Sequence, residues 1–182
     1  MRNLLTLISV VGLAQANLTF DPSEDIDRSW EEIVTENGFT YEYHSVTTDD
    51  GYILGLYRIP GKKGAPIGKA PVYMQHGILD SSDGWMMNFG ENAAAFVLAG
   101  KGYDVWLGNS RGNKYSRKHV SLDPDWDNSF WFFDFEDMGN HDVPSNIDYI
   151  KKFTGAEKVA LVAHSQGTTQ TFWGMASNEA YF

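Results

Sequence analysis

The sequence predicts an α/β fold with a mainly parallel sheet and flanking helices. Segments with the pattern of strands alternate along the chain with segments of helical pattern, as they do when helices cover a parallel sheet. Residues 158–163, KVALVA, form a continuous apolar run of the kind that is buried on both faces of such a sheet. The composition agrees, because 42% hydrophobic and 21% charged residues are typical of a globular chain.

The first sixteen residues predict a secretory signal peptide that is removed from the mature protein. Arg2 supplies a short positive region, residues 4–13 an apolar stretch, and residues 14–16, Ala-Gln-Ala, a cleavage site. A buried N-terminal helix is the alternative. The mature domain is then expected over residues 17–182, and Asn17 begins a glycosylation sequon. No later run is long and apolar enough to predict a transmembrane segment.

The first part of the mature chain predicts a helix, a hairpin and a strand. Residues 21–38 are polar with Trp30 and Ile33 as apolar anchors, which indicates a short helix ending near Gly38. Residues 41–60 alternate in the manner of two strands, and the Asp50-Gly51 pair between them favours a hairpin turn. A surface loop at 61–70, which lacks the spacing of a phosphate-binding loop, and a buried strand at 70–75 follow.

The remainder alternates between loops, helices and strands. In chain order, we expect a loop at 76–85, a helix at 92–102, a strand at 103–109, a polar loop at 110–119, an aromatic segment at 129–138, a helix from Pro144 to Gly155 capped by Asp142, the strand at 158–163 and a helix at 167–176.

Charge and cysteine content exclude several classes of function. The formal net charge is −10 and the pI about 4.8, which argues against nucleic acid as a partner because phosphate binding needs clustered Lys and Arg. The chain has no cysteine, so neither a thiol nucleophile nor a cysteine-based zinc site is possible. We expect no metal site and no cofactor.

The most informative stretch is LVAHSQGTT, where the apolar strand ends at a serine. Ser165, preceded by His164, lies between a strand and a helix in the pattern of a nucleophile elbow, a sharp turn that exposes a reactive hydroxyl. Such a turn requires small residues two positions away on either side, and Ala163 and Gly167 meet this requirement. The alternative is a serine in a tight turn without chemistry.

Two backbone amides are candidates for stabilising the negative charge that develops when a serine attacks a carbonyl. The helix after the elbow directs its N-terminus at the serine, so the N–H of Gln166 is one candidate donor. The second should come from the loop after an earlier strand. In residues 75–80, Gly77 allows a close approach and Ile78 offers its N–H, whereas His76 is expected to brace the loop.

Six segments, in this order, resemble the gastric and lysosomal acid lipases within the α/β-hydrolases. They are TTDDGYILGLYRIP, QHGILDSSDGW, GYDVWLGNSRGNKYSRKH, FWFFDFEDM, HDVPSNIDYI and AHSQGTT. The resemblance implies an α/β-hydrolase fold, of which residues 17–182 are the amino-terminal part. It also implies Ser165 as nucleophile, with Ile78 and Gln166 as the oxyanion-hole amides. One departure is Ala163, where the family pattern has Gly.

The resemblance further implies a function and a location. The expected reaction is hydrolysis of carboxylic esters in neutral lipids, triacylglycerol or sterol ester, at a lipid–water interface. The expected location is outside the cell or in the lysosomal lumen. Another acyl-transfer activity of the same fold, and an inactive secreted or lipid-binding fragment, are the alternatives.

A serine nucleophile needs a histidine base and a carboxylate, which follow the serine in this fold. All five histidines precede Ser165 or adjoin it, and Glu179 is the lone acid after it. The resemblance places both partners and a lid in a carboxy-terminal part. We therefore expect the chain as given to be truncated after the elbow helix and inactive by itself.

Three other features have two interpretations each. The acids Asp123, Asp125, Asp127 and Asp134 have the spacing of a calcium loop but suit an acidic surface loop better. The aromatic residues 130–135 favour core packing over contact with an acyl chain. Arg111 is a candidate for an anion site or for a structural salt bridge, and the salt bridge is the commoner role.

Overall fold

The computed structural model describes residues 27–67, 70–88 and 90–182. The predicted signal peptide, residues 1–16, and the sequon at Asn17 lie outside these residues. Within them, no helix has the length and apolar character needed to cross a membrane.

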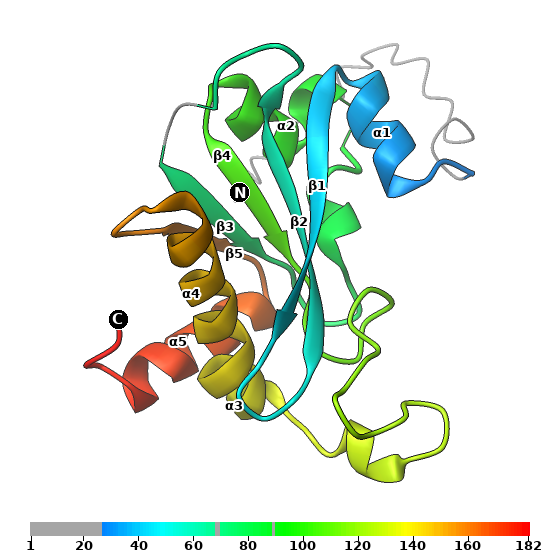
Figure 1. Ribbon diagram of the computed structural model, residues 1–182, viewed down its shortest axis with the longest axis vertical. Helices are drawn as coiled ribbons and strands as arrows, with labels where there is room; N and C mark the ends of the chain where they lie inside the picture. The colour runs from blue at the N-terminus through cyan, green and yellow to red at the C-terminus, as the bar shows by residue number, and fades with distance from the viewer. Residues whose placement is uncertain (1–26, 68–69, 89) are drawn as a thin grey trace, which may run out of the picture.

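A five-stranded sheet forms the centre of the molecule (Figure 1). Its strand order is β1-β2-β4-β3-β5, and the strands are β1 (Phe39–Thr47), β2 (Ile53–Lys62), β3 (Pro71–Gln75), β4 (Asp104–Gly108) and β5 (Ala160–Ala163). The α/β class is confirmed, but the sheet is mixed. The hairpin β1–β2 joins β4 antiparallel, whereas β4, β3 and β5 run parallel.

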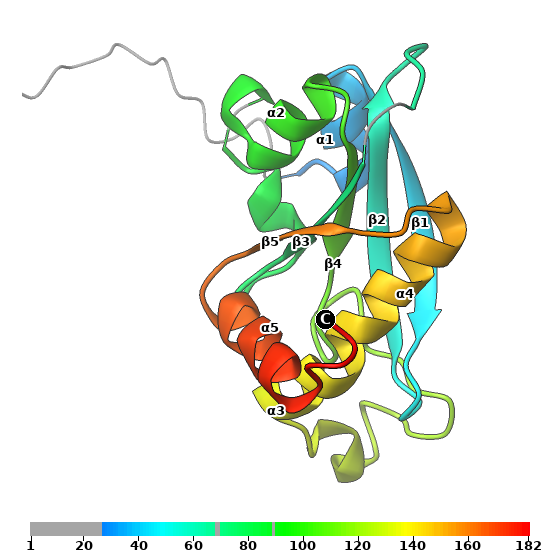
Figure 2. The ribbon, with the colours of Figure 1, turned by 90° about the vertical axis from the view of Figure 1, so that its left-hand side faces the viewer.

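Helices cover both faces of this sheet, as Figure 2 shows for α2 and α4. The helices are α1 (Trp30–Glu36), α2 (Ala94–Gly100), α3 (Phe135–Asp137), α4 (Val143–Thr154) and α5 (Gln166–Ser177). Short 3₁₀ turns lie at Ser82–Trp85, Gly90–Asn92 and Asn128–Trp131, and a π-helical turn, Met138–Asp142, joins α3 to α4.

The period of two along each strand divides the apolar residues between two cores. In β4, Val105 and Leu107 pack with α1 and α2, whereas Trp106 between them packs on the side of α4. β3 does the same with Met74 and Tyr73. Because successive side chains point to opposite faces, one apolar strand serves both cores.

The helical segment before β5 begins at Phe135, nine residues before the predicted start at Pro144. Asp134 caps it, with its carboxylate accepting from the N–H groups of Glu136 and Asp137. The prediction that Asp142 caps the helix is wrong: its φ of −67° and ψ of −49° are helical, and its side chain makes no capping hydrogen bond. Because the helix continues through the π turn into α4, the carboxylate of Asp142 is not used as a cap and can bind another group.

The strand predicted at 158–163 is shorter and more exposed than expected. β5 covers four residues, and their exposure alternates between exposed and half-buried. It pairs with β3 on one side, and no other strand of the described residues lies against its second edge. A strand at an edge cannot be covered as a central strand is, which explains the difference.

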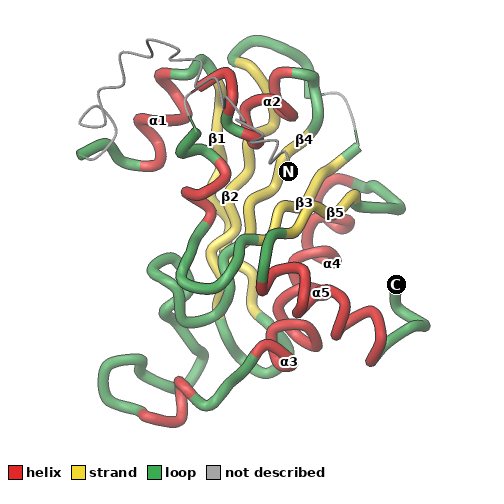
Figure 3. The backbone as a smooth tube through the Cα atoms, turned by 180° about the vertical axis from the view of Figure 1, so that it is seen from behind, coloured by secondary structure: helices red, strands yellow, loops and turns green. Residues whose placement is uncertain are grey.

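The carboxyl ends of the three parallel strands lie at one end of the sheet. Because β3, β4 and β5 are parallel, the segments that leave them start from this same edge. Figure 3 shows these segments, with α5 among them, gathered below the strands. Ser165 and the loop that contains Gly77 and Ile78 are therefore brought together at this end of the sheet.

Candidate active site

Ser165 lies at the tip of a sharp turn between β5 and α5. Its backbone has φ of 52° and ψ of −123°, a conformation that side-chain-bearing residues rarely adopt and that costs on the order of 1–3 kcal/mol. The turn is held by hydrogen bonds from the N–H groups of Thr168 and Thr169 to its carbonyl, at 2.9 and 3.3 Å. The Ser165 side chain is exposed to solvent.

Gly167 is the small residue that this turn needs. A Cβ at this position would lie 2.5 Å from the carbonyl oxygen of His76 and 2.6 Å from that of Gln75. Both are backbone atoms at the end of β3, so they cannot move aside as a flexible side chain could. On the other side of the serine, Ala163 pairs with Gln75 and is half-buried, so its methyl group is accommodated.

The loop after β3 packs directly against the serine. A Cβ added to Gly77 would lie 2.9 Å from the Cβ of Ser165, so only glycine permits this approach. Ile78 follows in this loop and is exposed, and Gln166 is the first residue of α5, where an N–H group has no acceptor within the helix. The two predicted amide donors thus belong to the two segments that meet at Ser165.

His76 braces this loop, as the sequence predicts. Its Nδ1 lies 2.7 Å from the carbonyl oxygen of Gly77 and must therefore donate. Its Nε2 then accepts from the N–H of Ser110 and the amide of Asn113, each at 3.1 Å. Burial lowers the pKa of His76, which favours this neutral form. With both ring nitrogens engaged, His76 is a scaffold residue and not a free base.

A network of buried, hydrogen-bonded polar side chains lies beneath the loop that follows β3. The sequence analysis did not predict this network. The amide of Gln75 donates to Ser110 Oγ at 3.0 Å and accepts from the hydroxyl of Tyr73. Asn146 of α4 donates to the same hydroxyl at 3.0 Å. A glutamine at the end of an apolar strand is the one local signal that could have indicated it. This network of hydrogen bonds links β3, the loop after β4, and α4.

None of the described histidines is hydrogen-bonded to the hydroxyl of Ser165. His164 is exposed, and the others bind elsewhere: His44 to Glu42 and Tyr149, His76 within its loop, His119 to the carbonyl of Asp50, and His141 to Asp49. The described residues therefore bring the segments of the two predicted amide donors to Ser165, but they place no histidine on its hydroxyl.

A cavity of about 950 Å³ opens beside the loop after β3. Its walls include Ile78, Leu79, Trp131, Phe133, Met138 and Gln166. The prediction that the aromatic segment packs in the core is right for Phe130, which is fully buried, and for Phe133, which is half-buried against the same core, but wrong for Trp131 and Phe132, which are exposed. Trp131 and Phe133 line the cavity, and Phe132 is exposed.

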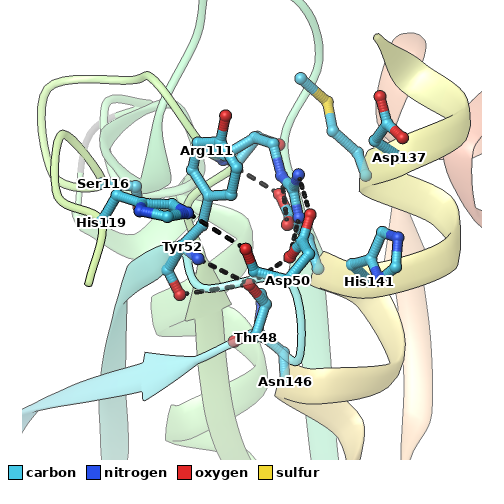
Figure 4. A network of polar contacts seen from close by, with 12 residues as sticks. Thr48, Asp50, Tyr52, Arg111, Ser116, His119, Asp137, His141 and Asn146 are labelled. Carbon is cyan, nitrogen blue, oxygen red and sulfur yellow. Dashed lines mark hydrogen bonds and ion pairs between the residues drawn. The ribbon is translucent and has the colours of Figure 1, made fainter. Parts of the chain in front are cut away.

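Arg111 forms a structural salt bridge, the commoner of its two predicted roles (Figure 4). Its guanidinium donates to Asp142 at 2.8 Å and to Asp50 at 2.6 Å, and lies 4.0 Å from the centre of the Tyr52 ring. Burial raises the pKa of Asp142 to about 6 although the charge of Arg111 opposes this. With two carboxylates bound, Arg111 has no role left in binding an external anion.

The acids of the predicted calcium spacing have partners within the protein. The carboxylates of Asp123 and Asp127 accept backbone N–H groups of the same turn, Asp125 pairs with Arg117, and Asp134 caps α3. The segment is therefore an acidic surface turn, the interpretation that the sequence favours.

A further group of acids and histidine lies at the hairpin turn. Ligand atoms of Asp49, Asp50 and His141 lie within 4.8 Å of one another. Asp50 already binds Arg111 and Thr48, and His141 Nδ1 lies 2.6 Å from Asp49. The sequence does not indicate this group, because His141 is distant along the chain from the two aspartates.

Comparison with known families gives two matches. The alpha/beta hydrolase fold family matches residues 70–177, and a partial alpha/beta-hydrolase lipase region matches residues 30–89. Among solved structures, an esterase of Pyrococcus furiosus superposes with a TM-score of 0.57 at 17% identity, covering 78% of this chain and 46% of that one. At this identity the likeness concerns the fold alone.

Curated relatives are much more similar in sequence. Gastric triacylglycerol lipase of Mus musculus is 51% identical over 152 residues, which are 82% of this chain and 38% of the relative. Lipase member K of Homo sapiens is 43% identical over 178 residues, 96% of this chain and 44% of the relative. The chain thus spans about two fifths of the length of these relatives. With the elbow geometry, these matches show that the chain belongs to the alpha/beta hydrolase fold family, with a sequence similar to those of the gastric-type lipases.

Proposed function

We propose that this chain carries the nucleophile and the oxyanion hole of a lipase that hydrolyses carboxylic ester bonds in neutral lipids. The observation that carries the proposal is Ser165, held at a positive φ on the elbow and facing the loop of Gly77. A strained serine at the carboxyl edge of a parallel strand, next to a helix N-terminus, suits nucleophilic attack on a carbonyl carbon.

In this mechanism, Ser165 Oγ forms a bond to the ester carbonyl carbon while its proton passes to a histidine base. The carbonyl oxygen becomes an oxyanion, which accepts hydrogen bonds from the N–H groups of Ile78 and Gln166. The alcohol leaves with the proton from the histidine, and water then hydrolyses the acyl-enzyme. We propose that the histidine and its carboxylate partner come from further polypeptide. This polypeptide would correspond to the part of the relatives that this chain does not span.

The relatives and the cavity support a proposal for the substrate class. Both curated relatives described above are lipases by name, and one of them is a triacylglycerol lipase. The cavity beside the elbow has the apolar walls Leu79, Trp131 and Met138. These features support a triacylglycerol or sterol ester with its acyl chain against these walls. A secreted or lysosomal location, with residues 1–16 as signal peptide and Asn17 available for glycosylation, is part of the proposal.

The experiment uses a chimera in which this chain continues with the remaining length of mouse gastric lipase. We expect a fluorophosphonate probe to label it at Ser165. Ser165→Ala should abolish labelling and reduce ester turnover by roughly 10⁶-fold. Ser121→Ala, which alters an exposed serine after β4, should change neither. Labelling that persists in the Ser165→Ala variant would show that the elbow has been misinterpreted.

A further inference from the structure

The backbone N–H group of Ile78 makes no hydrogen bond to any of the described residues. Ile78 lines the cavity, and no hydrogen bond within the described part of the chain starts from its backbone nitrogen. Because a backbone N–H is a strong donor, one that lies at a cavity wall without an acceptor is available to a ligand. The direction of this N–H depends on the peptide unit to which it belongs.

That peptide unit joins Gly77 to Ile78, and His76 holds its other end. The imidazole Nδ1 of His76 donates to the carbonyl oxygen of Gly77 at 2.7 Å. In a planar trans peptide the C=O and N–H groups point in opposite directions. The hydrogen bond to the carbonyl of Gly77 therefore keeps the N–H of Ile78 directed away from the imidazole.

The loop after β4 determines which ring nitrogen of His76 carries the proton. The Nε2 atom faces two donors, the N–H of Ser110 and the side-chain amide of Asn113, each at 3.1 Å. The opposite tautomer would place a proton on Nε2 against these donors, and the lone pair of Nδ1 against the carbonyl of Gly77. Contacts on both sides of the ring thus require the same neutral tautomer, with its proton on Nδ1.

The side chain of Asn113 is fixed so that it presents its amide nitrogen to His76. Its Oδ1 accepts from the N–H of Tyr115 at 3.0 Å, and its Nδ2 also donates to Asn109 Oδ1 at 2.8 Å. Asn109 is oriented in turn, because its own Nδ2 donates to the carbonyl of Gly55 at 3.1 Å. The tautomer of His76 therefore depends on side chains whose orientation the surrounding backbone sets.

We propose that His76 is a positioning residue for the oxyanion hole: in the tautomer that Asn113 and Ser110 impose, it holds the Gly77–Ile78 peptide so that the N–H of Ile78 faces the developing oxyanion. This rests on the proposed function, in which that N–H stabilises the ester oxygen. His76 takes up no proton in this role and acts through one peptide unit. Because the oxyanion forms only in the transition state, loss of this hold should lower kcat and leave KM nearly unchanged.

Two isosteric variants of the chimera separate the two sides of the ring. In His76→Asn the side-chain amide stands near the place of Nδ1 and can still donate to Gly77. In His76→Gln it stands near the place of Nε2 and keeps only the contacts with Ser110 and Asn113. With a soluble short-chain ester, we expect His76→Gln to lower kcat by at least about tenfold, with KM nearly unchanged, and His76→Asn to stay within about threefold of the parent.

His44→Gln is the matched control for these variants. His44 is a half-buried histidine of β1 that also has both ring nitrogens hydrogen-bonded, and it is not among the residues that line the cavity. We expect its kcat to equal that of the parent. Urea midpoints of every variant, measured in parallel, ensure that kcat is compared between folded proteins.

Nuclear magnetic resonance reads the tautomer independently of turnover. In the unaltered chimera labelled with ¹⁵N-histidine, long-range ¹H–¹⁵N correlation distinguishes a proton on Nδ1 from one on Nε2. We expect His76 to be neutral with its proton on Nδ1. Its resonance is assigned by its loss in His76→Gln and by its shift in Asn113→Ala, so the assignment does not depend on one variant.

The outcomes separate this inference from the proposed function. Equal kcat values for the two His76 variants, or a loss that appears in KM alone, would overturn the positioning role. A proton on Nε2 of His76 in the parent would overturn it as well. Absence of Ser165-dependent turnover in the parent chimera would refute the proposed function instead.

Discussion

Ser165 adopts its unusual backbone because the surrounding residues leave it no alternative. The loop of Gly77 closes one side, the carbonyl groups at the end of β3 lie under Gly167, and the first turn of α5 binds the serine carbonyl. Each contact depends on the absence of a side chain or on a fixed backbone group. The strain at one residue is therefore balanced by the packing of its neighbours.

A single methyl group at Gly167 should disrupt this packing. In the soluble chimera, we expect Gly167→Ala to lower the free energy of unfolding by about 2 kcal/mol or more, because its Cβ would meet two carbonyl oxygens at 2.5 and 2.6 Å. Urea unfolding followed by tryptophan fluorescence measures this change.

Gly100→Ala is the matched control for that substitution. It lies in α2, where the nearest side-chain atom would be 3.8 Å from the new Cβ, and alanine favours a helix. We expect its stability to be unchanged or slightly raised. Equal effects of the two substitutions would contradict the close approach at Gly167.

At the scale of elements, the helical segment from α3 through α4 ties the hairpin turn to the loop after β4. The π turn directs Asp142 inward, where it binds the side chain and the backbone N–H of Arg111. Arg111 also binds Asp50 of the hairpin turn. One buried arginine thus connects three segments that are distant along the chain, and breaking such a pair costs about 3–5 kcal/mol.

The buried carboxyl of Asp142 should make stability depend on pH. Its pKa is raised from the ordinary 3.8 to about 6, so between these values the folded chain keeps a proton that the unfolded chain releases. Its contribution to stability is therefore complete below about pH 4 and is lost as the pH rises through about 6. Urea midpoints of the chimera from about pH 4 to 7 measure this loss.

Asp142→Asn is the comparison for that measurement. The midpoint of the variant should fall less as the pH rises, because an amide at position 142 does not titrate. The pKa of Asp50 is lowered from its ordinary 3.8, so its contribution to stability is lost only below about pH 4. The pH scan does not go below this value. Parallel curves for parent and variant would show that Asp142 does not titrate in this range.

At the scale of the whole molecule, the two edges of the sheet differ in character. β1 carries mostly polar side chains, such as Thr40, Glu42 and Ser45, whereas β5 has the sequence ALVA with Val162 exposed. Next to it, α5 exposes Phe172. An apolar edge with unpaired backbone groups is a template for pairing with another chain.

The chain expressed by itself should therefore self-associate through β5. We expect light scattering after size-exclusion chromatography to show oligomers, and Val162→Lys to reduce them, because a charge at the edge opposes strand pairing. Tyr43→Lys adds the same charge to an exposed position on β1 and should leave the oligomers unchanged. A monomeric parent chain would refute this expectation.

The features that sequence alone determined depend on residues close together in the chain. The hairpin at Asp50-Gly51, the alternation of strands and helices, and the elbow at Ser165 follow from turn chemistry and periodicity, which act over a few residues. The need for a small residue at position 167 was also evident locally. Its cause, the carbonyl groups of β3, was not.

The tertiary structure decided what distant segments do to one another. Asp142 has the sequence position of a helix cap but binds an arginine 31 residues away, and β5 has a central strand's composition but lies at an edge. Phe132 stands in an aromatic run that suits a core, yet only Phe130 of that run is fully buried. Local patterns report which side chains are apolar or charged, whereas burial and pairing depend on which segments the folded sheet brings together.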